Sequence, residues 1–108
     1  MKSDDFYRGK RLVRTEWWID SSRLPQTIAW ARLRVFDDRA SDVSFADGSK
    51  NFGFKNEQYA QYFLGEDEFV AFSNLDSDDE VEYGISLAGL VPPSWSDGYT
   101  DFEYLGVY

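Results

Sequence analysis

Eight carboxylates lie within residues 66–82 of this 108-residue chain. They are Glu66, Asp67, Glu68, Asp76, Asp78, Asp79, Glu80 and Glu82. No lysine or arginine lies among them, since all eleven basic residues stand at or before Lys55. Carboxylates clustered in this way present a negative surface that speeds the association of a basic protein and is weakened by salt. The alternative is a solvated loop that maintains solubility, because runs of charge usually face water.

The charge of the chain is divided along its length. Residues 1–55 carry eleven basic side chains against eight carboxylates, whereas residues 56–108 carry twelve carboxylates and no basic side chain. The net charge of −9 disfavours nucleic acids and anionic membranes as ligands, because their phosphates would be repelled. We therefore expect residues 66–82 to bind a basic protein. An inhibitor or immunity-type protein for a basic enzyme is the concrete form of that expectation.

The acidic segment does not carry a calcium-binding pattern. A calcium loop of the EF-hand type that began at Asp76 would need glycine at its sixth position and glutamate at its twelfth. Those positions hold Val81 and Leu87. We expect neither a metal ion nor any other cofactor.

The composition speaks against an enzyme. The chain has no histidine and no cysteine, which removes the usual general base, the usual zinc ligands and every Ser-His-Asp or Cys-His arrangement. Its eight glycines form no nucleotide-binding motif. A glycosidase-like carboxylate pair is an alternative, but it has no specificity here because twenty acidic residues always supply some pair. We expect a protein without catalytic residues.

A second candidate site combines aromatic rings with guanidinium groups on one side of two expected strands. It comprises Arg14, Glu16, Trp18, Trp30, Arg32 and Arg34. Tryptophan and arginine are enriched in interface hot spots, and aromatic side chains stack on nucleotide bases. The alternative hypothesis is thus a platform for a small ligand or nucleotide. The structural interpretation of the same residues is cross-strand pairing on a water-facing side of the sheet.

A hairpin is the clearest of the elements that must position these residues. Asp47-Gly48 supplies the positive φ angles of a two-residue turn, and apolar residues flank it on both sides. Closing this turn pairs residues whose numbers sum to 95, so that Val43 faces Phe52.

Residues 28–36 predict a longer strand before the hairpin. Ala31, Leu33 and Val35 alternate with bulky or charged residues, which gives the strand one apolar side. Pairing Val35 with Val43 keeps that apolar side continuous with the hairpin.

Residues 12–19 predict another strand with the same alternation. Trp17 and Ile19 are expected on the apolar side, and Arg14 and Trp18 on the other. The result is a four-stranded antiparallel meander over about residues 11–54.

The periodicity then changes to that of a helix. Asn56 is suited to cap it, and Gly65 to end it. Aromatic residues recur with the spacing of one helical face, at Tyr59, Tyr62 and Phe63. We expect one short helix, about residues 57–64, packed on one face of the sheet.

The rest of the chain gives weaker signals. Residues 69–75 fit either a helical turn or an extended segment, and residues 76–82 are expected to be irregular and acidic. Pro92-Pro93 ends any regular element. Residues 99–108 fit either a short last strand or a surface tail.

Together these signals predict one α+β domain over residues 1–108, with residues 1–10 and 92–108 loosely ordered. No signal peptide or membrane span is evident in the sequence, and the absence of cysteine suits a reducing compartment. We expect a cytoplasmic protein, and the sequence leaves its oligomeric state open.

Overall fold

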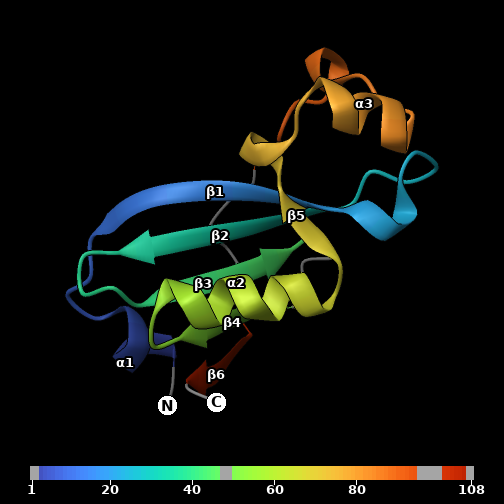
Figure 1. The fold of residues 1–108 in the computed structure, drawn as a ribbon. Helices are drawn as coiled ribbons and strands as arrows, with labels where there is room; N and C mark the ends of the chain where they lie inside the picture. Colours follow the sequence, from blue (N-terminus) through green and yellow to red (C-terminus); the bar gives the residue numbers. More distant parts are fainter. Residues whose placement is uncertain (1–2, 47–49, 95–100, 107–108) are drawn as a thin grey trace.

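The computed structural model describes residues 3–46, 50–94 and 101–106. Its centre is a six-stranded sheet in the order β5-β1-β2-β3-β4-β6, in which only the β4–β6 pair is parallel (Figure 1). The strands are β1 (Leu12–Asp20), β2 (Trp30–Phe36), β3 (Ser41–Phe45), β4 (Asn51–Phe54), β5 (Phe69–Ala71) and β6 (Phe102–Gly106). The α-helices are α1 (Ser3–Tyr7), α2 (Glu57–Glu66) and α3 (Ser77–Tyr83), and short 3₁₀ turns occupy η1 (Ser21–Arg23), η2 (Phe72–Asn74) and η3 (Leu87–Gly89).

The α+β class expected from the sequence is confirmed. The expected four-stranded meander is present as β1 to β4, but β5 and β6 extend the sheet at its two edges. Two helices in the described ranges, α1 and α3, join the single helix that the sequence predicts.

The hairpin of β3 and β4 has the register that the sequence predicts. Val43 lies opposite Phe52, and Ser41 lies opposite Phe54. The expected turn residues, Asp47 and Gly48, lie outside the described residues.

The register between β2 and β3 differs from the expected one. Val43 lies opposite Leu33, and Val35 lies opposite Ser41. The turn is shorter than expected because the Phe36 amide donates to the Ala40 carbonyl at 2.9 Å and Arg39 adopts φ 76°. A shift of two residues leaves side chains on their original faces, so the apolar side stays continuous.

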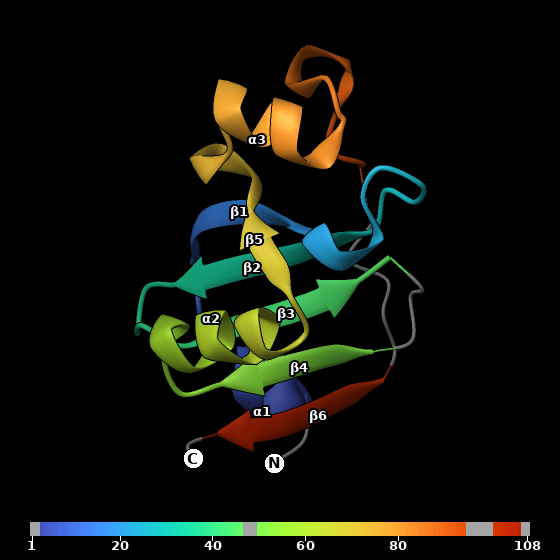
Figure 2. The same cartoon turned by 45° about the vertical axis from the view of Figure 1, so that its right-hand side comes forward.

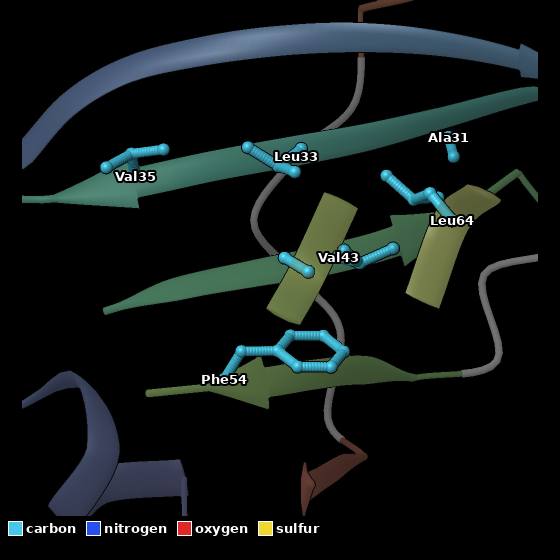
Figure 3. Packing of buried hydrophobic residues seen from close by; sticks show 7 residues of the cluster. Ala31, Leu33, Val35, Val43, Phe54 and Leu64 are labelled. Atoms are coloured by element: carbon cyan, nitrogen blue, oxygen red, sulfur yellow. The ribbon is translucent and has the colours of Figure 1, made fainter. Parts of the chain in front are cut away.

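Helix α2 packs on that apolar side, which we call the α2 face. Residues from three strands and the helix form its core: Ala31, Leu33, Val35, Val43, Phe54, Ala60 and Leu64. Figure 3 shows Leu33, Val43 and Phe54 beneath the helix that carries Leu64. The buried side chains of the three neighbouring strands lie next to one another on this face, so one short helix covers its middle.

The expected limits of α2 are confirmed at its start and corrected at its end. The Asn56 side chain accepts a hydrogen bond from the Tyr59 amide at 3.1 Å, as an N-cap does. The helix runs through Gly65 to Glu66, so Gly65 is not the cap. Tyr62 is 62% exposed and does not belong to the buried side of the helix.

The facing of β1 is opposite to the expectation. Trp18 lies across from Ala31 and Glu16 across from Leu33, which places Trp18 and Glu16 on the α2 face. Trp17 and Ile19 therefore lie on the opposite face, in a cluster with Trp30. Because this second face is also covered, β1 has apolar side chains on both sides. The alternation of apolar and polar residues therefore does not show which side of β1 faces α2.

The opposite face of the sheet is covered at both ends. At one end Phe6 of α1 is 2% exposed and packs with Phe36, Ala40 and residues of β6. Residues 1–10 as a whole were expected to be loosely ordered, yet Phe6 contributes to the core. At the other end, Tyr83 and other apolar residues from 70–90 pack against Trp17, Ile19 and Trp30.

The acidic segment that was expected to be irregular contains α3. Asp76 caps this helix, and Gly84 ends it with φ 69° and ψ 39°. The preceding segment, whose conformation the sequence left open, is a three-residue strand followed by a 3₁₀ turn. Of the C-terminal residues, Phe102–Gly106 form a strand.

Candidate protein-binding surface

Three carboxylates of α3 hold the helix in place through local hydrogen bonds. One oxygen of Asp76 accepts from the amides of Asp78 and Asp79, at 3.0 and 3.2 Å, and Asp79 in turn accepts from the Asp76 amide at 2.9 Å. This reciprocal arrangement is a capping box. Glu80 accepts from the Leu87 amide at 2.8 Å and so ties the helix to η3. Part of the acidic character therefore serves the local fold.

Four other residues of α3 form its outward side. Ser77, Asp78, Val81 and Glu82 are exposed. Val81 is 85% exposed, so an apolar side chain faces the solvent between carboxylates. On the inward side, Tyr83 packs with Ile85 and Leu90 against the sheet. We call Asp76, Asp78, Val81 and Glu82 the α3 surface.

The other three predicted carboxylates lie apart from α3. Glu66 ends α2, and Asp67 and Glu68 follow it. All three are exposed, and β5 separates them from α3. In both ribbon views α3 lies beyond one end of β5 and α2 beyond the other (Figures 1 and 2). The eight carboxylates thus form two groups rather than one continuous patch.

Neither group is neutralised by a basic side chain in the part of the chain that the structure describes. The ion pairs found there use other carboxylates: Arg14 with Glu16 and Glu57, Arg34 with Asp42, Lys10 with Asp38, Lys50 with Glu103, Arg23 with Asp20, and Arg8 with Asp5. The charge of the α3 surface is therefore directed at the solvent.

The residues of the alternative Trp/Arg site do not share a face. Arg14 and Trp18 lie on the α2 face, where Arg14 binds Glu57 of the helix and the Trp18 indole donates to Glu16 at 3.3 Å. Glu57 and Glu16 hold the pKa of Arg14 above its ordinary value. On the opposite face, Trp30 is 8% exposed and Arg32 is 4% exposed. The residues predicted to form one binding face are therefore divided between the two faces of the sheet.

A buried polar network on the opposite face was not anticipated from the sequence. Nε and Nη2 of Arg34 donate to the Asp42 carboxylate at 3.0 and 2.6 Å. The Tyr7 hydroxyl donates to the same carboxylate at 2.5 Å. Asn51 donates to the Tyr7 oxygen at 3.3 Å and accepts from Ser44. Asp42 and Ser44 are fully buried.

This network joins α1 to three strands. Burial, and then the negative charge of Asp42, raise the pKa of Tyr7 above its ordinary value. The signal in the sequence was polar alternation: Asp42 and Ser44 flank Val43 in a strand whose other side is apolar. Its members serve as links between elements and none is exposed enough to be a docking residue.

Within the described ranges, no group of three or more acidic side chains is arranged to hold a metal ion. The same residues include no helix with the length and apolar character needed to cross a membrane.

Comparison of the chain with protein-family models, curated proteins and solved structures finds no significant match.

Proposed function

We propose that this protein is a non-enzymatic interaction module that binds a basic protein through the α3 surface. The supporting observation is Val81, which is 85% exposed between the carboxylates of Asp78 and Glu82. An exposed apolar side chain favours binding because a partner that covers it removes it from water. The surrounding negative charge selects a partner with a positive surface. An inhibitor or immunity-type role toward a basic enzyme is the form that we propose.

The distribution of charge along the chain supports the same proposal. The acidic half lacks any lysine or arginine, and the described carboxylates of α3 make no ion pair. Glu66, Asp67 and Glu68 form a second acidic group on the far side of β5, which extends the negative field without adjoining α3. Such a field raises association rates and is screened within roughly 8 Å at physiological ionic strength.

We further propose that the protein acts in the cytoplasm. The absence of cysteine supports this, because many small proteins of oxidising compartments depend on disulfides.

Charge reversal on α3 tests the proposal. The protein is immobilised, the native lysate is passed over it, and bound proteins are eluted with rising salt. We expect wild type to retain a basic protein that elutes as salt increases, and the double variant Asp78→Lys/Glu82→Lys to lose it. With the purified partner, the association rate should fall roughly tenfold or more in that variant.

A matched control separates the α3 surface from total charge. Asp4→Lys/Asp101→Lys makes the same change of charge at two exposed positions, one in α1 and one before β6. We expect this control to bind like wild type. Equal loss of binding in both double variants, or binding that does not respond to salt, would contradict the proposal.

A further inference from the structure

A cavity of about 460 Å³ opens beside η1, where β1 and β2 meet the turn that follows α2. The residues that line it include two acidic residues, one arginine and three aromatic residues: Asp20, Asp67, Arg23, Trp30, Phe45 and Phe69. The volume lies in the range of small-ligand sites, which combine apolar walls with a few convergent polar groups. One other cavity, of about 230 Å³, also combines three aromatic residues with two carboxylates, but two lysines line it as well, so its charge does not favour a cation.

Hydrogen bonds hold the rim of this cavity in place. The Ser21 amide and hydroxyl both donate to the Glu68 carbonyl, at 3.0 and 2.8 Å. The Asp20 amide donates to the Ala29 carbonyl at 2.9 Å. The turn after α2 and the turn after β1 are thus joined, so the cavity exists before any ligand arrives.

The inner carboxylate already contacts a guanidinium group. Asp20 is 7% exposed, and one of its oxygens accepts from the amide and the hydroxyl of Ser22 at 3.0 and 2.6 Å. The other oxygen lies 3.3 Å from Nε of Arg23. The Arg23 side chain is 63% exposed, so this contact is weak and open to replacement by a better-placed cation.

The walls favour a planar cation over an anion. Two carboxylates outnumber the single arginine of the lining, and Phe45 and Phe69, whose ring centroids lie 5.4 Å apart on the α2 face, supply aromatic surface. Guanidinium groups stack on such faces and donate several parallel hydrogen bonds to carboxylates, which a compact ammonium does less well.

We infer that this cavity binds a guanidinium group, with Asp20 and Asp67 accepting hydrogen bonds from its N–H groups beside the rings of Phe45 and Phe69. The guanidinium belongs either to a free arginine-like molecule or to an arginine side chain of a peptide. This inference is independent of the α3 surface, because none of the residues that line the cavity belongs to α3.

Nuclear magnetic resonance titration of the ¹⁵N-labelled protein tests the inference. N-acetyl-arginine amide should shift the amide signals of residues 20–23 and 67–69 and the indole signal of Trp30. N-acetyl-citrulline amide, which has the same shape without the charge, should not. A glycine-flanked arginine peptide that binds more tightly than the amide identifies a peptide as the source, and equal binding identifies the free molecule.

Three variants make the test specific. Asp67→Asn should weaken arginine-amide binding roughly fivefold, whereas Glu66→Gln should not, since Glu66 lines a separate groove with Tyr59 and Tyr62. Arg23→Gln should strengthen binding, because it removes the internal competitor for Asp20. Equal shifts with citrulline, or equal effects of Asp67→Asn and Glu66→Gln, would overturn the inference. Loss of partner capture by α3 variants would leave these results unchanged.

Discussion

The carbonyl oxygen of Glu68 accepts two hydrogen bonds from Ser21, one from its amide at 3.0 Å and one from its hydroxyl at 2.8 Å. Glu68 itself adopts φ 65°, a left-handed conformation that is uncommon for a residue with a side chain. The two bonds join the turn after α2 to the turn after β1. They also set the position at which β5 pairs with β1.

Removing the Ser21 hydroxyl tests the importance of this junction. Ser21→Ala deletes the bond at 2.8 Å and keeps the amide bond, so we expect the free energy of unfolding to fall by about 1 kcal/mol. Urea denaturation measures the change. Ser73→Ala, at an exposed serine of η2, is the control and should change stability by no more than a few tenths of a kcal/mol.

Two glycines should respond to alanine in opposite directions. A Cβ at Gly53 would lie 2.5 Å from Cζ of Phe102, so Gly53→Ala forces that ring of β6 to move and should cost about 1–3 kcal/mol. A Cβ at Gly65, inside α2, meets nothing within 4 Å. Gly65→Ala should therefore stabilise the protein by about 0.5 kcal/mol through helix propensity. Thermal unfolding of both variants distinguishes these signs.

The parts of the fold that the sequence predicts well are those that local chemistry determines. The turn residues in the sequence predict the register of β3 with β4, and Val43 does lie opposite Phe52. Asn56 can begin a helix because its side-chain oxygen reaches the amide of Tyr59. The hairpin register and the start of α2 depend on neighbouring residues and not on the rest of the chain.

The parts that the sequence does not predict depend on distant segments. Trp17 and Trp18 are both aromatic, so the facing of β1 depends on what covers each side of the sheet. The parallel pairing of β6 with β4 joins residues about fifty positions apart, and no local pattern encodes it. Asp76 caps α3 and Gly84 ends it, but the run of carboxylates between them predicted an irregular segment.

The candidate site was predicted only in part, for the same reason. Its acidic residues and their lack of basic neighbours are visible in the sequence, but their division into two groups by β5 is not. The cavity beside η1 was not predicted at all, because Asp20, Trp30 and Asp67 come from three separate segments.

The Asp42 carboxylate should be among the most sensitive positions for stability. It is fully buried and accepts two hydrogen bonds from Arg34 and one from Tyr7. Asp42→Asn removes the charge that these donors surround, and we expect a loss of about 3 kcal/mol. Asp4→Asn, in the exposed first turn of α1, is the control and should lie close to wild type. An Asp42→Asn variant as stable as that control would contradict this account.

The stability contributed by Tyr7 should disappear at alkaline pH. Burial and Asp42 raise its pKa above the ordinary 10.0, so above pH 10 the unfolded chain loses the Tyr7 proton while the folded chain retains it. Folding then requires proton uptake, and the contribution of Tyr7 declines as pH rises by up to about 1.4 kcal/mol per unit. Below pH 10 it is fully present.

Comparison with Tyr7→Phe isolates this effect from the other tyrosines. At neutral pH the variant should be less stable by about 2 kcal/mol, because it lacks the hydroxyl bonded to Asp42. The difference between wild type and Tyr7→Phe should shrink as pH rises above 10. Urea denaturation at neutral pH and at several alkaline values measures it, and a difference that stayed constant would contradict the assigned cause.

Asp76 has two roles that substitution can separate, because it caps α3 and contributes charge to the α3 surface. Asp76→Ala removes the oxygen that accepts from the amides of Asp78 and Asp79, so stability should fall by about 1 kcal/mol. Hydrogen exchange at those two amides should quicken. Asp76→Asn keeps an accepting oxygen and removes the charge, so it should cost only a few tenths of a kcal/mol.

The two variants should then differ in a second measurement, the association rate with a basic partner. Asp76→Asn should slow association while the hydrogen exchange of α3 stays close to that of wild type, because charge steers the encounter without holding the helix. If Asp76→Asn associated as fast as wild type at low salt, the carboxylate of Asp76 would serve only to begin α3. The binding surface would then reduce to Asp78, Val81 and Glu82, whose side chains make no capping bond.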